Sequence, residues 1–527
     1  MTVGLVAGRV GVGMSAGLAL TLAALCAGIA VGAAWREARG WAPAFVAALV
    51  LAGIGAYRMH RNRLDAWERL PPREVQLKVR CGRLYPSKDR ERFAALVTVT
   101  EAERHVAELR GQPVYVSLSI DPRRLAPIAG SELRVRGVLE RLPVIGEPYS
   151  FEGYLTDLGI NFRLARGEVL GESGRPGAYR LLCAAAERRI HSILGIGIAR
   201  ERPDLAGVLR AMLLGRTAEM SQASRLLFMR SGTLHLFAIS GLHIVAIALA
   251  LNGLLAFARV PQLPRFAAGM VALWFYVDVT GAAPSAVRAL FMVALVELAF
   301  VVRRAVNPLA TLTTAWLLVL LVSPLQFFTA SFQMSYGIVA SLILVGVPLY
   351  ESIRSRWRPF EAVPADDRGL VRRTFVWLVD QVLSAGALGA SASLVGLVAG
   401  VAFFRLLTPG SILVNLVMIP VSTLVIYAGL ASLLCGLAGA TLLASVFNHT
   451  AALVLLAMER FLESAMCLPG MYLAGQFRWS VLGGCGMAAV LALALACYAR
   501  AAPNRPGRWI APFALCTALL LLGVRYG

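Results

Sequence analysis

Apolar residues in this chain gather into runs of about 20 residues, each long enough to cross a bilayer as a helix. Two runs open the chain, at about 14–34 and 41–57. The first is too long for the apolar core of a typical signal peptide, so we expect it to be retained. Further runs follow residue 232, at 235–257, 266–282, 285–302, 307–322, 329–349, 375–404, 411–436, 439–458, 479–499 and 509–524. The pattern predicts a polytopic α-helical membrane protein with about 10–12 transmembrane helices.

The stretch 58–175 has a different pattern, in which short runs alternate apolar and polar residues with period two. Such alternation is typical of half-buried strands, and Gly111, Asp121-Pro122 and Gly130 separate the runs as turn residues do. The expected strands are 75–80, 95–100, 114–120, 133–139 and a weaker fifth at 160–169. Five short strands in about 100 residues predict a small external β-barrel of the OB type, a fold that often binds oligonucleotides.

Residues 176–232 are helical and amphipathic, with Leu182, Ile190 and Ile193 on one side and Arg180 and Arg188 on the other. No run here is apolar enough to span a bilayer. We therefore expect interfacial helices that join the barrel to a transmembrane bundle at 233–527.

Positive charge is abundant and is carried almost entirely by arginine. The net charge is +21, and only two of the 51 basic residues are lysines. Arginine binds phosphate through a planar fork, which favours a nucleic-acid or lipid-headgroup partner, although a GC-rich genome would also enrich arginine. The barrel strands carry basic residues that alternate with core positions, and we expect these to bind DNA or else to form an ordinary solvated face. They are Lys78, Arg80, Arg134, Arg136 and Arg163.

Loop arginines predict the topology of the bundle. One alternating set of loops carries 13 arginines and the opposite set carries only Arg405, Arg460 and Arg478. Cytoplasmic loops collect positive charge, so the arginine-rich set is expected inside. The barrel then lies on the outer side of the membrane.

Polar residues within the spans mark a candidate pathway. His235, Ser240 and His243 fall near one end of the run 235–257, where we expect a single helix to present them over about 140° of one side. The next outer turn holds Asp278 and Arg288, which form either a structural ion pair or a polar constriction that meets phosphates.

Ser285 lies on the same helix face as Arg288, three residues earlier. Gln333 lies near the outer end of another span. Asn415 and Pro420 lie in a later span that we expect to be kinked, as interrupted helices commonly mark transport pathways. Glu297 lies mid-span without an evident partner.

Several stretches resemble the ComEC-type competence proteins. His235 to His243 is close to the family's HLLAISGLH signature, and Gly281 to Met292 fits G-x-x-x-S-x-x-R-A-x-x-M. The other matching stretches are 149–155, 213–216, 331–336 and 413–420. Arg216 stands where aspartate is common in the family. The resemblance implies an inner-membrane channel that takes up single-stranded DNA during natural transformation.

The resemblance also implies partners: a cytoplasmic ATP-driven motor, a DNA receptor, in some cases a separate nuclease, and a second copy of the chain as a homodimer. The chain has no G-x-x-x-x-G-K-[ST] loop of its own for an ATP-driven step. It also lacks the H-x-H-x-D-H cluster of the metallo-β-lactamase-like domain that many family members carry. We therefore do not expect an enzyme.

Neither a metal nor another cofactor is expected. The eight cysteines include no C-x-x-C pair. Two alternatives to the channel stay open. One is a transporter or channel for a small anion, which would use the same arginine and kinked helix. The other is an intramembrane metal enzyme that would use His235, His243 and Asp278, although histidines eight apart are poorly placed for joint ligation.

Overall fold

The computed structural model describes residues 1–10, 14–35, 41–67, 72–85, 91–121, 127–143, 150–237, 239–357, 370–500 and 509–526. The chain divides into two compact units. Unit 1 comprises Met1–Leu181 and Thr313–Phe332, and unit 2 comprises Leu182–Leu312 and Gln333–Gly527. Each unit is described separately below.

Unit 1 begins with three helices, α1 (Thr2–Val10), α2 (Ala16–Trp35) and α3 (Trp41–Trp67). Helices α2 and α3 confirm the two predicted opening runs, and α1 precedes them. Glycine allows α1 and α3 to pack with their backbones in contact, because a Cβ on Gly53 would lie 2.2 Å from the Met1 carbonyl oxygen. A Cβ on Gly4 would likewise clash with the Val50 carbonyl.

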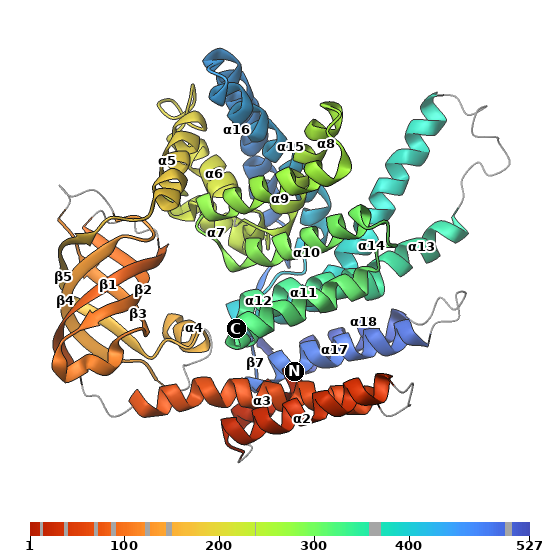
Figure 1. Cartoon of the computed structure of the whole chain (residues 1–527). Helices are drawn as coiled ribbons and strands as arrows, with labels where there is room; N and C mark the ends of the chain where they lie inside the picture. Colours follow the sequence, from red (N-terminus) through yellow and green to blue (C-terminus); the bar gives the residue numbers. More distant parts are fainter. Residues whose placement is uncertain are drawn as a thin grey trace. The chain divides into compact units, whose positions relative to one another are not determined.

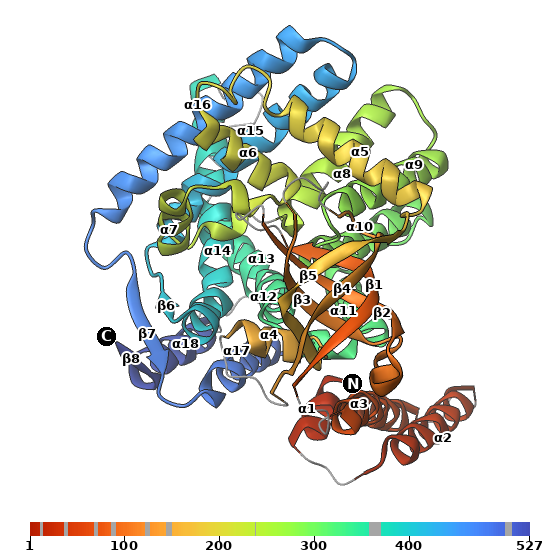
Figure 2. The ribbon, with the colours of Figure 1, turned by 90° about the vertical axis from the view of Figure 1, so that its left-hand side faces the viewer.

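All five predicted strands are present, and all except the third are longer than the alternation indicated. They are β1 (Arg73–Tyr85), β2 (Arg92–Ala102), β3 (Pro113–Ser119), β4 (Glu132–Arg141) and β5 (Phe162–Gly174). They close into a barrel in the order β1-β2-β3-β5-β4, in which only the β3–β5 pair is parallel (Figures 1 and 2). The sequence prediction of a small β-barrel beside a helical membrane protein is therefore confirmed.

The barrel core follows from the period of two. Alternate positions of β1, such as Val75, Leu77 and Val79, are buried, while the positions between them point outward. Matching positions of β2 to β5 complete a closed apolar interior. Burial raises the pKa of the Cys81 thiol to about 12, so this cysteine is part of the core rather than a reactive group.

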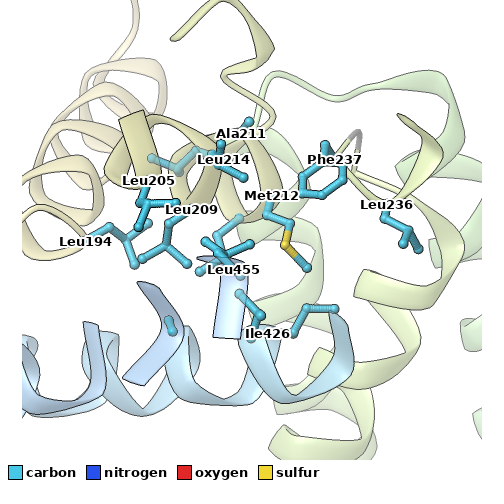
Figure 3. Close-up of a cluster of buried hydrophobic side chains, with 14 of the residues drawn as sticks. Leu194, Leu205, Leu209, Ala211, Met212, Leu214, Leu236, Phe237, Ile426 and Leu455 are labelled. Atoms are coloured by element: carbon cyan, nitrogen blue, oxygen red, sulfur yellow. The ribbon is translucent and has the colours of Figure 1, made fainter. Parts of the chain in front are cut away.

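Unit 2 begins at Leu182 within α5 (Ala178–Ile193), and α6 (Pro203–Leu214) and α7 (Gln222–Arg230) follow. We expected these helices to lie on a membrane surface. Helix α6 instead is buried at nearly every position, from Leu205 to Leu214 except Arg210. Its side chains pack against Ile426 and Leu455, which belong to α15 (Ser411–Leu437) and α16 (Thr441–Met466) (Figure 3). This short helix is thus an internal element, because neighbours far along the chain cover both of its faces.

The remaining helices are α8 (Gly241–Phe257), α9 (Gln262–Val279), α10 (Pro284–Val301), α11 (Pro308–Val322), α12 (Ala330–Ser341), α13 (Val347–Arg356), α14 (Leu370–Phe404), α17 (Val481–Ala499) and α18 (Ile510–Gly523). A π-helical turn, Leu342–Gly346, joins α12 to α13 and extends that span beyond the predicted end at 349. Within the described residues, eight helical segments are long and apolar enough to cross a membrane. The protein is a multi-pass membrane protein.

Unit 2 also contains a small sheet that the sequence pattern did not predict. Strand β7 (Leu473–Phe477) lies between β6 (Leu406–Leu407) and β8 (Val524–Tyr526). The sheet joins the segments that follow α14, α16 and α18. Its strands have two to five residues, too few for an alternation signal to stand out.

Candidate functional site

His235 and His243 do not lie on the single helix that we predicted. A short 3₁₀ turn, Leu234–Leu236, holds His235, and α8 begins only at Gly241. Ser240 precedes the helix with extended backbone angles, φ −111° and ψ 174°. The Ser285 hydroxyl donates a 2.7 Å hydrogen bond to the Ile239 carbonyl. In a continuous helix the Ile239 carbonyl would accept a backbone N–H from the next turn. The Ser285 hydroxyl of α10 takes the place of that donor and so stabilises the backbone break before Gly241.

His243 is fully buried and anchors the start of α8. Its Nδ1 accepts the backbone N–H of Ser240 at 3.4 Å and lies 3.0 Å from the Ser240 hydroxyl. Because Nδ1 accepts a backbone N–H, the ring proton resides on Nε2. Nε2 is buried and has no hydrogen-bond partner among the described residues. His243 therefore holds the fold of the segment and does not line an open surface.

His235 is exposed, in contrast to His243. Its Nδ1 donates to the Gly232 carbonyl at 3.1 Å, which leaves Nε2 as an accessible acceptor. Gly232 has a φ of +72°, and a Cβ at this position would lie 2.7 Å from Cβ of Ser411. The segment that carries the histidines therefore contacts the start of α15 as well as α10.

Arg288 is the largest fully buried side chain of the described chain, with 1% of its surface exposed. It lies one turn after Ser285 on α10 and close enough to the Tyr336 hydroxyl of α12 for an electrostatic interaction. Asp278 is half-buried one residue before the end of α9. The Asp278–Arg288 ion pair remains a prediction.

Two of the other predicted pathway residues lie near the starts of their helices, and the third lies within a helix. Gln333 is half-buried at the beginning of α12, one turn before Tyr336. Asn415 is half-buried in the second turn of α15, and its Oδ1 has no hydrogen-bond partner among the described residues. Pro420 is exposed, and α15 runs through it from Ser411 to Leu437 as one helix, so the helix is not interrupted there.

Carboxylates neutralise most of the basic residues predicted on the barrel. Lys78 lies 3.0 Å from Glu101, Arg80 lies 2.9 Å from Glu132 and Arg136 lies 3.1 Å from Glu74. Strand register places Lys78 opposite Glu101 and Arg80 opposite Glu132. Glu74 lies two residues from the position opposite Arg136 and reaches it diagonally. Arg134 is exposed and has no ion pair with a described residue.

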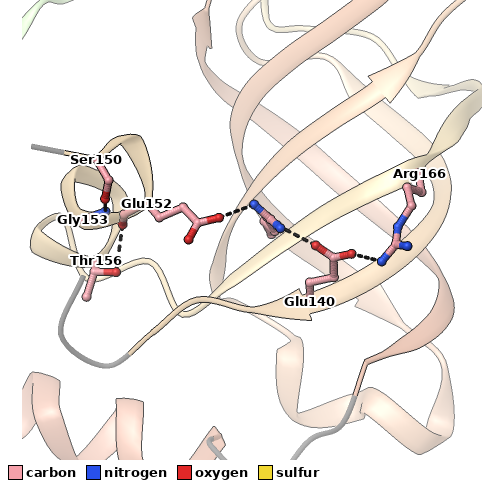
Figure 4. Close-up of polar contacts among 7 residues, drawn as sticks. Glu140, Ser150, Glu152, Gly153, Thr156 and Arg166 are labelled. Carbon is pink, nitrogen blue, oxygen red and sulfur yellow. Dashed lines mark hydrogen bonds and ion pairs between the residues drawn. The ribbon is translucent and has the colours of Figure 1, made fainter. Parts of the chain in front are cut away.

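Figure 4 labels Glu140, Glu152 and Arg166 of an ion-pair network on β4, α4 (Phe151–Asp157) and β5 whose central residue is Arg163. The Arg163 Nε lies 2.6 Å from Glu140, and Arg163 also pairs with Glu152 of α4, while Arg166 pairs with Glu140. Hydrogen bonds from Arg163 and Arg166 lower the pKa of Glu140. The stretch 73–175 carries 17 basic and 14 acidic residues. The barrel is thus nearly neutral, although the whole chain is strongly basic.

An aromatic cluster on the barrel was not among the predicted site residues. It consists of Tyr85, Tyr115, Phe151 and Tyr154, whose neighbouring ring centroids lie 5.1–6.1 Å apart. Arg83 lies over the Tyr85 ring at 5.5 Å. Rings of this kind can stack on bases, and Phe151 exposes 48% of its surface. Three of the rings lie on different elements far apart in sequence, so no local pattern could reveal them.

Metal ligation was the remaining alternative at the histidines. Within the part of the chain that the structure describes, no three His, Cys, Asp or Glu side chains come together in a way that could hold a metal ion.

Comparison with known proteins places these residues in a family. The model of the "Competence protein" family matches residues 212–502, which include all the predicted pathway residues from His235 to Pro420. The chain is similar to ComE operon protein 3 of Bacillus subtilis, with 29% identity over 142 residues. That alignment covers 27% of this chain and 18% of the Bacillus protein. No solved structure matches the chain. Because the family model matches more than half of its residues, this multi-pass membrane protein belongs to the competence protein family.

Proposed function

We propose that this competence protein is an inner-membrane channel that passes one strand of DNA into the cytoplasm during natural transformation. The barrel would lie on the outer side and receive the DNA, and the bundle would conduct it. An ATP-driven cytoplasmic motor and a DNA receptor would act with the channel, and a separate nuclease would supply the single strand. In this proposal the protein acts as a channel and catalyses no reaction.

The observation that carries the proposal is the fully buried guanidinium of Arg288 within a span that the family model covers. An arginine inside the membrane is costly and is retained chiefly for function. Ser285 and Ile239 connect its helix to the segment of His235 and His243. A phosphate that entered between α8, α10 and α12 would meet Arg288 directly.

The distribution of loop arginines also supports the proposed orientation in the membrane. The loops that we assign to the cytoplasm carry 13 of the arginines, whereas the barrel is nearly neutral. DNA would therefore meet little long-range attraction at the barrel, and the exposed Phe151 ring and Arg134 would supply the contacts there.

Gene deletion followed by uptake of labelled DNA tests the function. The deletion strain should internalise no label, and the wild-type gene should restore uptake. A reporter inserted at the exposed turn of Gly111 tests the orientation. Activity of that reporter in the cytosol would contradict the channel, because the barrel would then lie on the wrong side.

A small-anion channel is the second candidate, and the near-neutral barrel favours it. The two candidates differ in the ligand that the full-length protein should bind in detergent. A DNA channel should bind a single-stranded oligonucleotide in a salt-dependent way, whereas an anion channel should bind a small anion and ignore the oligonucleotide.

A further inference from the structure

A second polar site lies in unit 2, in a pocket between α8, α9 and α10. The pocket has a volume of about 240 Å³. Its polar lining consists of Asn252, Gln262, Arg265 and Glu297. Phe266, Met270 and Leu273 are among its apolar lining residues. The pocket accounts for Glu297, whose surroundings the sequence left unexplained.

Helix geometry separates this pocket from the proposed pathway. Asn252 follows His243 by nine residues on α8, and Glu297 follows Arg288 by nine residues on α10. At about 100° per residue, nine residues rotate a side chain by about 180°. The pocket residues therefore point away from the faces that carry His243 and Arg288, and the pocket does not continue that polar group.

The polar groups of the pocket have defined chemistry. The Asn252 amide donates a 3.0 Å hydrogen bond to Oε1 of Glu297, which orients the carboxylate and leaves Oε2 for another donor. Arg265 is partly buried and makes no ion pair with any described residue. It lies in the first turn of α9, where the helix dipole also favours an anion. The pocket thus offers one site for a cation and one for an anion, and its two charged side chains sum to zero.

The depth of these groups matches the boundary between lipid headgroups and acyl chains. Glu297 and Asn252 lie four and five residues before the ends of α10 and α8. With a rise of 1.5 Å per residue, these positions are about 6–8 Å from the helix ends. The polar zone of a bilayer leaflet has a similar thickness of about 5–8 Å.

The helices around the pocket expose apolar side chains. Phe300, a lining residue, exposes 54% of its surface, and Leu254 exposes 51%. Such surfaces face lipid in a multi-pass membrane protein. A ligand that fits must therefore combine a zwitterionic head with an apolar body.

We propose that the pocket binds the headgroup of a phospholipid that carries a primary ammonium, of the phosphatidylethanolamine class. The Arg265 guanidinium pairs with the phosphate, and the Glu297 carboxylate accepts from the ammonium. Basic pockets at the cytoplasmic ends of transmembrane helices bind anionic headgroups, but the added carboxylate here selects a zwitterion. A quaternary ammonium cannot donate a hydrogen bond to Glu297, so phosphatidylcholine should bind more weakly.

Native mass spectrometry of the full-length protein, delipidated in detergent and titrated with single lipids, tests the proposal. The wild type should retain phosphatidylethanolamine about tenfold better than phosphatidylcholine or phosphatidylglycerol, as expected for one charge-assisted hydrogen bond. Equal retention of the three lipids by the wild type would overturn the proposal without any variant.

Two variants assign the two contacts. Glu297→Gln should erase the preference for phosphatidylethanolamine over phosphatidylcholine, whereas Arg265→Gln should weaken the binding of both lipids about tenfold. Arg259→Gln is the matched control, because Arg259 is exposed and does not line the pocket. An unchanged lipid preference in Glu297→Gln would refute the assignment.

Soluble phosphoethanolamine distinguishes a lipid from a free metabolite. Millimolar phosphoethanolamine should not displace the lipid, because the apolar walls also hold the acyl chains. Displacement at that concentration would mean that the occupant is a soluble phosphoamine, and the lipid assignment would fail.

Discussion

The arginines of the barrel and of the bundle differ in their surroundings. Arg80 lies on the outward face of β1, exposed to water and paired with Glu132, whereas Arg288 is buried among helices. A pair in water is screened and contributes little, while a buried guanidinium interacts strongly with its neighbours. The strand pattern drew attention to Arg80, but the surroundings make Arg288 the more consequential residue.

The same contrast explains why basic composition alone is a weak guide to DNA binding. The 17 basic residues of 73–175 face 14 acidic ones. Cross-strand register brings the two signs together, so little net field remains to attract a polyanion. Substitutions made in the barrel can be compared with substitutions made in the bundle to test this contrast.

The largest expected effect concerns Arg288. Arg288→Ala should reduce uptake of labelled DNA about tenfold or more, because it removes the guanidinium from the proposed pathway. Arg80→Ala should reduce uptake less than about fivefold, since its charge is already paired at the surface. The amount of each variant in membranes should be measured by immunoblot. A similar loss of DNA uptake in the two variants would contradict the expected difference between Arg288 and Arg80.

Burial of α6 predicts the next largest effect. Leu209→Ala should lower the free energy of unfolding by about 2–5 kcal/mol, because it opens a cavity beneath α15 and α16. Leu182 of α5 is exposed, and Leu182→Ala should change stability by no more than about 0.5 kcal/mol. Unfolding of the full-length protein in detergent measures both, and equal effects would place α6 at a surface after all.

The start of α8 predicts a smaller effect. Ser240→Ala removes the hydroxyl contact to His243 at the beginning of the helix and should cost about 1 kcal/mol. If Ser240 lay inside a continuous helix, the same change would be neutral or stabilising, because alanine has the higher helix propensity. The sign of the change in unfolding free energy therefore decides between the two.

Two carboxylates of unit 1 should respond to pH in opposite directions. The pKa of Glu140 is lowered by Arg163 and Arg166, so its stabilising contribution is present above its ordinary pKa and is lost as the pH falls through the lowered value. Burial raises the pKa of Asp157, so a destabilising contribution at neutral pH is relieved as the pH falls.

Thermal unfolding of the full-length protein between pH 7 and pH 3, followed by circular dichroism, measures both contributions. Glu140→Gln should reduce the loss of stability on acidification, and Asp157→Asn should increase it. The same sign of change in the two variants would contradict the opposite environments of these carboxylates.

The smallest effect separates Arg134 from its paired neighbours. Arg134 is exposed and has no ion pair with a described residue, so it is available to a phosphate. Arg134→Ala should lower the slope of log affinity for single-stranded DNA against log salt by about 0.7, the value for one phosphate contact. Arg80→Ala should leave the slope nearly unchanged. Filter binding with full-length protein at several salt concentrations measures the slopes.

The lengths of the apolar runs predicted the membrane-spanning helices, and alternation with period two predicted the five barrel strands. Both patterns follow from which side chains avoid water, so neither needs knowledge of the packing partner. The same local information placed Ser285 and Arg288 on one helix face.

Tertiary structure alone decided the break before Gly241, the burial of α6, the pairing of the barrel charges and the pocket of Glu297. Each depends on a contact between distant segments, such as the bond from Ser285 to Ile239 or from Asn252 to Glu297. Such contacts leave no period in the sequence, because their energy comes from which surfaces meet after the chain has folded.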